Sequence, residues 1–201
     1  MQEIIYVLTN EAMPGYVKIG KTSTSLQQRI GELSSSTSIP LPFTCFYACT
    51  VQNATFVEHQ LHDAFDDSRK NPRREFFEIS PARVVAALKL VQIEDITPRE
   101  EIVESQEDRE ALNEARSARR TTFKFSKVGI PIGAEIVFSR DKNKKAKILD
   151  DRSIEYNGES TSLSTSAQKI LGYNYGVAGT DYWMFDGETL DERRRRIENG
   201  E

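Results

Sequence analysis

The chain has 201 residues, of which 38% are hydrophobic and 29% are charged, and its formal net charge is −4. This length suits one large domain or two small ones with modest cores. No apolar run approaches the ~20 residues of a membrane span, and Met1-Gln2-Glu3 does not open a secretory signal, so we expect a cytoplasmic protein. Cys45 and Cys49 lie on one apolar segment and are expected to be reduced thiols, since a zinc site needs further ligands.

The negative charge is concentrated in the middle of the chain. Residues 91–120 contain nine acidic and five basic residues, whereas residues 1–90 contain nine of each and residues 121–201 contain thirteen of each. An equal number of acidic and basic residues in the first and last parts of the chain does not exclude a protein that acts on DNA, since a metal-dependent nuclease needs carboxylates at its active site.

The first ninety residues predict a small mixed sheet flanked by helices. In residues 3–9 and 16–20, apolar and polar residues alternate enough to predict two strands. The segment between them is rich in turn formers, so the two strands should form a hairpin. Thr24 or Ser25 can cap a helix, and Asn53 can cap a second one with apolar residues at helical spacing. Strands are also predicted at residues 43–51 and 75–79, followed by a helix at residues 81–90.

The next segment predicts a polar helical linker between two domains. Thr97-Pro98-Arg99-Glu100 combines a capping threonine, a proline in the first turn and a glutamate three residues after the cap. The helix would continue to Arg120 with no wide apolar stripe, which is typical of a spacer. We therefore predict a first domain at residues 1–92, a linker at 93–121 and a second domain at 122–201.

The second domain is predicted to be a small β-rich α+β domain. Strands at residues 135–138 and 146–149 flank a basic turn, and Asn157-Gly158 indicates a hairpin. A short helix at residues 167–171 and a strand at residues 182–185 follow. The charged tail at residues 191–201 is expected to fray. The whole chain is thus assigned to the α/β (α+β) class.

Polar side chains in the first domain suggest a site for phosphodiester hydrolysis. Tyr6 could activate a nucleophile if its pKa, about 10 in water, were lowered. Lys18 lies on the partner strand of the predicted hairpin and could supply that cation. Arg29 and Glu58 lie on the borders of the apolar faces of their helices, and His62 follows one turn after Glu58. Each residue alone is more often structural, so the interpretation depends on their combination.

This combination resembles the GIY-YIG nuclease superfamily. The resemblance rests on Ile4-Ile5-Tyr6-Val7, on Lys18-Ile19-Gly20 in place of the usual Tyr-Ile-Gly (a phage-type variant), and on Arg29 and Glu58. Ile4 replaces the glycine of the first motif. The resemblance implies that Tyr6 is the general base, that Arg29 stabilises the phosphorus charge, and that Glu58 binds Mg²⁺ or Mn²⁺. A lysine at position 18 can still act as donor and cation.

Residues 123–190 resemble the RAMA domain (restriction enzyme and adenine methylase associated). The resemblance rests on the segments 133–138, 156–159 and 162–167 and on Tyr182-Trp183 with Gly187. It implies binding to DNA, modified DNA included. Tyr173, Tyr175 and Tyr182 could stack on a base, whereas Trp183 is more often a core residue.

The predicted DNA contacts fall into three groups. A basic loop and the end of the hairpin supply one group, the basic turn of the second domain a second, and a helix N-terminus a third. They are Lys21, Arg69, Lys70, Arg73 and Arg74; Arg140, Lys142, Lys144 and Lys145; and Ser164 and Ser166. A solvated loop explains the first group equally well, and helix capping explains the serines. Glu75 is expected to anchor Arg29 or Lys18.

The sequence therefore predicts a metal-dependent DNA endonuclease, used in restriction or anti-phage defence. A second interpretation is a catalytically weak or inactive DNA-binding protein that retains the same fold. A third makes the polar helix a dimerisation element, so that a homodimer pairs two nicking sites.

Overall fold

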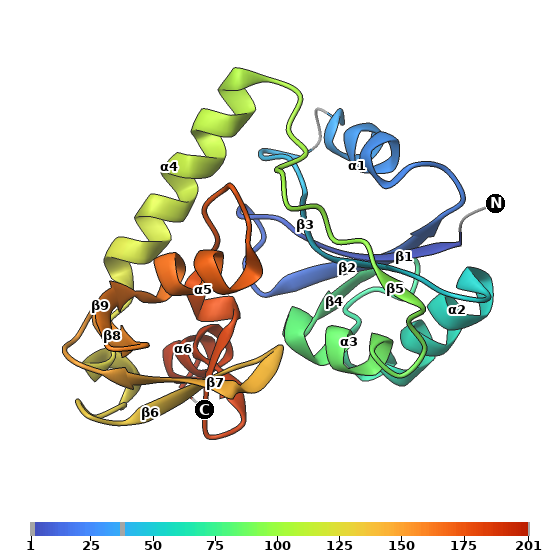
Figure 1. Cartoon of the computed structure of the whole chain (residues 1–201). Coiled ribbons are helices and arrows are strands. Elements are labelled where there is room, and N and C mark those ends of the chain that lie inside the picture. Colours follow the sequence, from blue (N-terminus) through green and yellow to red (C-terminus); the bar gives the residue numbers. More distant parts are fainter. Residues whose placement is uncertain (1–2, 37–38, 201) are drawn as a thin grey trace. The chain divides into compact units, whose positions relative to one another are not determined.

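The computed structural model describes residues 3–36 and 39–200, without the side chains of residues 120–122. The chain forms two compact units, which divide between Leu112 and Asn113 within helix α4 (Gln106–Thr122). Figure 1 shows the elements of both units. Among the described residues, no helix combines the length and apolar character that a membrane span requires. The α+β class predicted from the sequence is confirmed, since each unit contains one sheet and several helices.

Unit 1 contains a five-stranded sheet in the order β4-β2-β1-β3-β5. Its strands are β1 (Ile4–Thr9), β2 (Tyr16–Thr22), β3 (Thr44–Thr50), β4 (Phe76–Glu78) and β5 (Glu94–Asp95). Every neighbouring pair is antiparallel, so the predicted mixed sheet is wrong. Four of the strands were predicted, whereas β5 was not, because a two-residue strand gives no periodic pattern.

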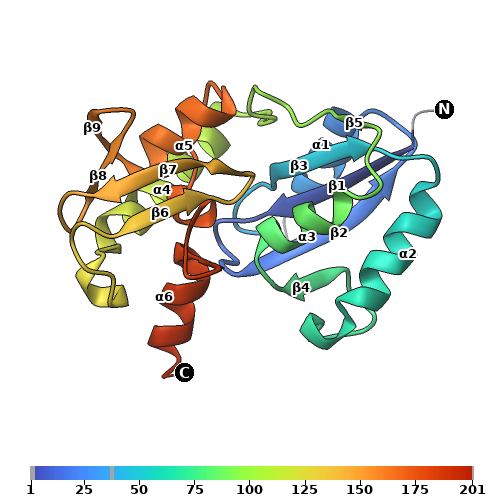
Figure 2. The same ribbon diagram turned by 60° about the horizontal axis from the view of Figure 1, so that its bottom comes forward.

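Helices cover both faces of this sheet. Helix α1 (Leu26–Ser34) lies on one face, and α2 (Ala54–Ala64) and α3 (Pro81–Leu88) lie on the other (Figure 2). The caps follow the sequence prediction, because Ser25 accepts from the amide of Gln28 and Asn53 accepts from the amide of Phe56. A short 3-10 helix, η1 (Asp66–Ser68), follows α2.

Alternation along β1 sends its side chains into two apolar layers. Ile4, Tyr6 and Leu8 pack with Leu26 and Ile30 of α1, while the residues between them face the other helices. All of the β1 residues up to position 8 are at most 2% exposed. Both faces of the strand are therefore buried, and its one reactive side chain, Tyr6, lies inside the α1 layer.

The two cysteines also lie in this interior. Cys45 and Cys49 are buried and are not joined in a disulfide, as predicted. Burial, assisted by the charge of Asp95, raises the pKa of Cys49 to about 12. A thiol with this pKa stays protonated and unreactive at neutral pH.

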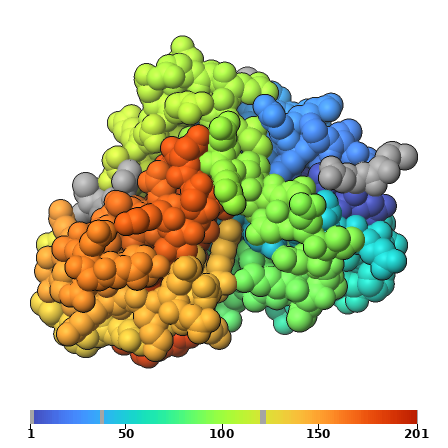
Figure 3. Space-filling model, in the orientation of Figure 1, coloured from blue at the N-terminus to red at the C-terminus, as the bar shows by residue number. Residues whose placement is uncertain are grey.

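The segment before α4 is extended, so the predicted helix start at Thr97 is wrong. The hydroxyl of Thr97 accepts from the amide of Ala48 at 3.1 Å, and Ile96 and Ile102 pack against the core of unit 1. Because a residue that precedes proline disfavours the helical region, Thr97 suits this extended path. The segment lies on the surface of unit 1 (Figure 3), and the helix begins only at Gln106.

Unit 2 contains a six-stranded antiparallel sheet in the order β11-β10-β6-β7-β8-β9. The strands are β6 (Glu135–Phe138), β7 (Asp141–Ile148), β8 (Ser153–Tyr156), β9 (Glu159–Ser162), β10 (Trp183–Phe185) and β11 (Glu188–Thr189). Asn157 and Gly158 have positive φ angles of 53° and 78° and form the predicted hairpin turn. The basic segment after β6 is mostly strand β7, so the predicted long turn at residues 139–145 is wrong.

Helices α5 (Leu163–Leu171) and α6 (Leu190–Glu198) complete unit 2, with short 3-10 helices η2 (Ser126–Val128) and η3 (Gly179–Asp181). Trp183 is 0% exposed, which confirms its prediction as a core residue. The expected frayed tail is wrong, because Thr189 and Glu192 form a capping box at the start of α6.

A buried carboxylate that is paired with arginines also holds α6 in place. Asp191 accepts hydrogen bonds from Arg119 of α4, at 2.9 Å, and from Arg194 and Arg195 of its own helix. In α4 itself, Leu112 and Arg116 are buried within the chain at 0% and 2% exposure. These positions are therefore not available for the dimer contact that the polar helix suggested.

Candidate active site

Tyr6 lies directly over Gly20 of the neighbouring strand. The register pairs Tyr6 with Gly20 and Leu8 with Lys18, so the prediction that Lys18 meets Tyr6 across the hairpin is wrong by two residues along the strand. A Cβ atom at Gly20 would lie 2.5 Å from the Tyr6 hydroxyl oxygen. The glycine of the Lys-Ile-Gly segment is thus needed to accommodate the tyrosine ring.

Arg29 is the cation that contacts Tyr6. Its Nε donates to the Tyr6 hydroxyl at 3.3 Å, and its Nη1 lies 3.4 Å from a carboxylate oxygen of Glu32. Burial raises the pKa of Tyr6, and the hydrogen bond and charge of Arg29 only partly oppose this effect. The expected lowering of the Tyr6 pKa by Lys18 is therefore wrong, and the resting side chain is a neutral phenol.

Lys18 forms an ion pair with Glu75, which confirms one of the two anchors expected for that glutamate. The lysine is 7% exposed and lies 5.6 Å from the centre of the Phe76 ring. Burial alone would raise the pKa of Glu75, but the hydrogen bond from Lys18 and the charges of Lys18 and Arg29 lower it overall. Glu75 is therefore a carboxylate surrounded by the cationic groups of the site.

Glu58 is paired with Lys21, a contact that the sequence did not predict. The two charged groups are 2.8 Å apart, and the Glu58 side chain is 16% exposed. Lys21 follows Gly20 on β2 and so faces the α2 side of the sheet, opposite to Lys18. Strand β2 therefore carries one lysine–glutamate pair on each face of the sheet.

A surface cavity of about 450 Å³ lies at this end of β2. Lys21, Arg29, Glu3 and Glu32 line it, together with Thr22, Ser23, Thr24, Ala54 and Thr55. The cavity adjoins the first residues of α2 and the residues just before α1, and helix N-termini favour anions. It thus brings together a lysine from one face of the sheet and the tyrosine-bound arginine from the other.

The charges of these groups also act on one another. The pKa of Tyr6, raised first by burial, is raised further by the charges of Glu75 and Glu58. Strand β4 pairs only with Tyr16, Val17 and Lys18, so it does not cover the end of β2. Tyr6, Arg29 and Glu58 therefore belong to one electrostatic neighbourhood, and Lys18 joins it through its ion pair with Glu75.

His62 connects α2 to β2. Its Nε2 lies 3.0 Å from the carbonyl oxygen of Ile19, and its Nδ1 lies 3.4 Å from Nη2 of Arg69. Because an arginine only donates, Nδ1 is the acceptor and the Nε2–H group donates to Ile19. The ring packs on Phe77 at 5.0 Å. Both nitrogens thus bind protein groups, which assigns His62 a positioning contact and gives no support to the predicted catalytic one.

The basic loop around η1 divides into inward and outward residues. Arg69 donates to the carbonyl of Arg74 at 2.7 Å and lies over the Phe77 ring, so its predicted contact with DNA is not supported. Lys70 pairs with Glu78 at 2.8 Å but is 70% exposed. Arg73 and Arg74 are exposed and remain candidates for DNA contact.

The predicted contacts in unit 2 divide similarly. Ser164 and Ser166 are 5% and 1% exposed, and they accept hydrogen bonds from the amide of Gly179 and from Nε1 of Trp183. These hydroxyls stabilise the fold and are not available for DNA. Arg140 donates to the hydroxyl of Tyr173 at 3.2 Å. The lysines along β7, Lys142, Lys144 and Lys145, are exposed or partly exposed.

A metal ion could use only part of this site. Within residues 3–36 and 39–200, no group of three histidine, cysteine or acidic residues could hold one. Glu58 is nonetheless a partly exposed carboxylate close to a cavity that could admit phosphate and water. This donor set fits Mg²⁺, which is commonly bound through one or two carboxylates, substrate phosphates and waters.

Unit 1 is a small three-layer α+β domain, with helices on both faces of its sheet. Residues 3–92 match the model of the T5orf172 domain, a phage-associated domain related to nucleases. The match supports nuclease activity and DNA binding in general terms. It does not extend to residues 93–201, where the RAMA resemblance stays a prediction. The comparisons with curated proteins and with solved structures gave no match.

Proposed function

We propose that this protein is a GIY-YIG-type, metal-dependent DNA endonuclease that acts in restriction or anti-phage defence. The observation that carries the proposal is that Arg29, which donates to Tyr6, and Lys21, which pairs with Glu58, line one surface cavity. These pairs supply three kinds of group. The Tyr6 hydroxyl can exchange a proton, Arg29 is a planar cation, and Glu58 is a carboxylate. Hydrolysis of a phosphodiester requires all three kinds of group.

The cavity would receive the scissile phosphate. Arg29 and Lys21 line it, and the side chains of both residues are more than one third exposed. Arg29 keeps its Nε on Tyr6, so its remaining donors can bind phosphate oxygens while the side chain is held in place. Its charge would then oppose the negative charge that develops on phosphorus.

Tyr6 would take the proton of the attacking water. Its hydroxyl accepts a hydrogen bond from Arg29, which favours phenolate, but burial raises its pKa. The proposed general base therefore works better as pH rises. Lys18 would act from the same face of the sheet, where it holds Glu75 and keeps that carboxylate away from Tyr6 and Arg29.

Glu58 would hold Mg²⁺ or Mn²⁺, in exchange for its contact with Lys21. The bound metal would stabilise negative charge on the phosphate and on the leaving oxygen. Lys21, once released, remains within reach of the same cavity and can bind the DNA backbone.

One observation favours the second candidate, a DNA-binding protein without efficient cleavage. In the structure Glu58 is already neutralised by Lys21, and Tyr6 is a buried phenol with a raised pKa. The same cationic cavity could then bind a phosphate without hydrolysing it.

Cleavage assays with matched DNA substrates separate these candidates. Unmodified, adenine-methylated and cytosine-modified duplexes would be incubated with wild type and Glu58→Gln in Mg²⁺ or Mn²⁺. We expect wild type to cut at least one substrate and Glu58→Gln to bind it without cutting. Glu159→Gln, which changes an exposed glutamate in unit 2, is the control. If wild type binds all three substrates and cuts none, the endonuclease proposal fails and the binding candidate stands.

A further inference from the structure

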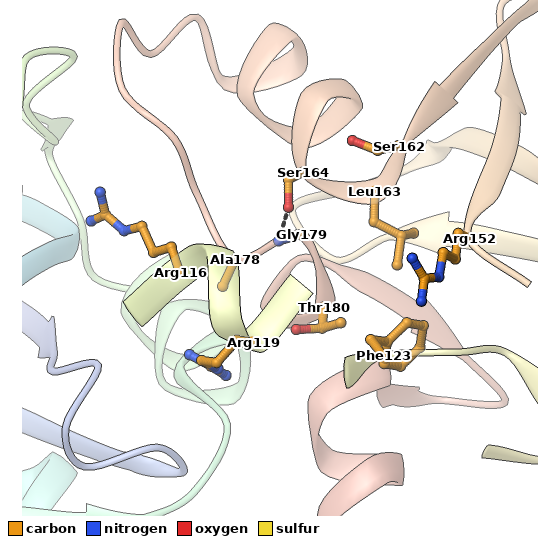
Figure 4. Close-up of a pocket in the computed structure, with 10 residues that line it drawn as sticks. All are labelled: Arg116, Arg119, Phe123, Arg152, Ser162, Leu163, Ser164, Ala178, Gly179 and Thr180. Carbon is orange, nitrogen blue, oxygen red and sulfur yellow. Dashed lines mark hydrogen bonds between the residues drawn. The ribbon is translucent and has the colours of Figure 1, made fainter. Parts of the chain in front are cut away.

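Unit 2 contains a pocket of about 260 Å³ that the predicted sites do not include. It lies between the second half of α4, the start of α5 and the segment that leads into η3 (Figure 4). Its lining residues are Arg116, Arg119, Phe123, Arg152, Ser162, Leu163, Ser164, Ala178, Gly179 and Thr180.

The wall formed by α5 and η3 is fixed by close packing. The amide of Gly179 donates to the hydroxyl of Ser164 at 3.2 Å, as Figure 4 shows. A Cβ atom at Gly179 would lie 2.3 Å from the carbonyl carbon of Leu163. Opposite this wall, Phe123 is 6% exposed and packs edge-on against Phe125 at 5.3 Å. The pocket is therefore formed before any ligand binds.

The lining combines apolar side chains with hydroxyls and arginines. Phe123, Leu163 and Ala178 provide apolar surface, and Thr180 and Ser162 add hydroxyls. Three of the ten lining residues are arginines, and none of these ten described residues is acidic.

The arginines differ in what they can contribute. Arg119 is held at 2.9 Å by Asp191, and Arg116 lies over the Tyr175 ring, so both act mainly as fixed walls. Arg152 lies on the turn between β7 and β8, is exposed, and extends toward Leu163 and Phe123 in Figure 4. Arg152 is thus the cation best placed to meet a ligand at the entrance.

Size and chemistry together limit the ligand. The pocket is smaller than the ~300–1,000 Å³ typical of sites for drug-sized molecules, so it suits a single ring system. An aromatic and aliphatic interior suits a planar ring, hydroxyls suit its polar edge, and an arginine at the entrance suits an attached anion. A nucleobase that carries a phosphate has each of these features.

The sheet of unit 2 offers a path for a nucleotide that belongs to a strand. Strand β7 carries Lys142, Lys144, Lys145 and Lys147, and the chain then runs through residues 149–151 to Arg152. These lysines suit the sugar–phosphate backbone, whereas the pocket at the end of the path suits one base.

We propose that this pocket binds a single nucleobase together with its phosphate, with the ring between Phe123 and Leu163 and the phosphate at Arg152. The assignment of DNA as the source of that nucleotide rests on the proposed function. In that case the base is unstacked from the strand, and the pocket determines which bases, modified ones included, the protein recognises. A free mononucleotide has the same chemistry and is the other source.

Titration of the full chain with dAMP and with dCMP tests the site itself. We expect saturable binding of at least one mononucleotide, weakened about tenfold or more in Ala178→Leu, which fills the pocket. Arg152→Ala should weaken it several-fold, with partial recovery in Arg152→Lys, because only the planar donors are lost. Lys169→Ala, an exposed lysine outside the pocket, is the matched control. Since Arg152 is exposed, its variants test the proposal even if Ala178→Leu fails to fold. The proposal is overturned if both Ala178→Leu and Arg152→Ala bind with unchanged affinity. It is also overturned if wild type binds no mononucleotide and gives no response in the DNA titration below.

Duplexes that carry 2-aminopurine distinguish the two sources. A fluorescence increase with wild type but not with Ala178→Leu identifies a base unstacked from DNA, whereas mononucleotide binding without that increase identifies a free nucleotide. Glu58→Gln serves in both titrations, because it should abolish cleavage and leave the pocket intact. Binding without any cleavage by wild type would refute the endonuclease proposal alone, and cleavage without any effect of the pocket variants would refute the pocket alone.

Discussion

The two units use charged side chains in different ways. At the site of unit 1, Glu75 and Glu58 are each paired with one lysine, Lys18 and Lys21, and each pair has a member that is more than one third exposed. In unit 2, by contrast, Asp191 is 5% exposed and accepts from three arginines at once. Glu188 is similarly held by Arg193 and Arg196.

This difference indicates which charges are available for function. A single pair that reaches solvent contributes about 0–1 kcal/mol and can exchange its partner for a metal or a phosphate. A buried carboxylate with several donors cannot be released, because the loss of one member leaves uncompensated charge in the interior. We therefore expect the charges of the unit 1 site to act on substrate and those around Asp191 to maintain the fold.

The largest predicted effect on stability is at Asp191. Replacement by alanine leaves Arg119, Arg194 and Arg195 facing one another, so we expect a loss of about 3–5 kcal/mol in the free energy of unfolding. Trp183 is the only tryptophan and lies in the core of unit 2, so its fluorescence reports the unfolding of this unit. Lys169→Ala should leave the same transition almost unchanged.

The stability contributed by Asp191 also depends on pH. Burial would raise the pKa of Asp191, but the charges of Arg119, Arg194 and Arg195 lower it overall. The contribution is therefore complete above the unfolded pKa of about 3.9 and is lost as pH falls through the lower folded value. If Asp191→Ala and wild type unfold at the same denaturant concentration at pH 7, this account of unit 2 is wrong.

The second prediction concerns catalysis at Arg29. Lysine cannot both hold the Tyr6 hydroxyl and present planar paired donors to phosphate, so Arg29→Lys should lower the rate of cleavage about 10²–10³-fold. Affinity for DNA, measured by fluorescence anisotropy, should change much less. Arg83→Lys, on α3, provides an arginine control. A parallel loss of rate and affinity would show that Arg29 only binds DNA.

Local sequence signals predicted the elements of unit 1 well. Ser25 and Asn53 cap their helices through contacts three residues away, and the hairpin of β1 and β2 depends on neighbouring turn formers. Distant contacts caused the errors. Thr97 looked like a helix cap but pairs with Ala48, and the charged tail is ordered because Asp191 meets Arg119, 72 residues earlier.

The sequence predicted which residues form the site better than it predicted which of them are in contact. The charges of Arg29 and Glu58 both affect the pKa of Tyr6, so these three residues lie near one another, as their order and spacing suggested. The register of β2 against β1 could not be derived, since turn residues did not fix which pairs meet. For this reason Lys18 was placed opposite Tyr6, and the contacts of Gly20 with Tyr6 and of Lys21 with Glu58 were missed.

Gly20→Ala tests whether the Tyr6 ring must lie on β2. The added methyl group would overlap the ring, so either the ring or the strand must shift, at a cost of about 1–3 kcal/mol. Hydrogen exchange of the β1 amides measures this loss within unit 1, and the Trp183 transition of unit 2 is the internal control. Cleavage should fall with Gly20→Ala even at temperatures where unit 1 stays folded. Full activity in a folded variant would argue against a role for Tyr6.

The pH dependence of cleavage tests Tyr6 as the base. Burial raises its pKa above about 10, so between pH 7 and pH 9 the active fraction, and with it the single-turnover rate, should rise about tenfold per pH unit. The raised pKa stabilises the fold below pH 10 and this contribution is lost only at higher pH, so assays below pH 9 avoid unfolding. Tyr6→Phe should give a low rate without this slope. A plateau reached below pH 8 would identify another base.

The smallest predicted effect is that of Lys21 on stability. The Lys21 side chain is 37% exposed and pairs only with Glu58 among the ion pairs of the described chain, so solvent screens the interaction strongly. Lys21→Gln should change the free energy of unfolding of unit 1, followed by hydrogen exchange, by less than about 1 kcal/mol. The same variant should bind Mg²⁺ more tightly, because Glu58 no longer exchanges a lysine for the metal. Destabilisation as large as that of Asp191→Ala would show that the two units use their ion pairs alike, and that the lysine–glutamate pair is structural.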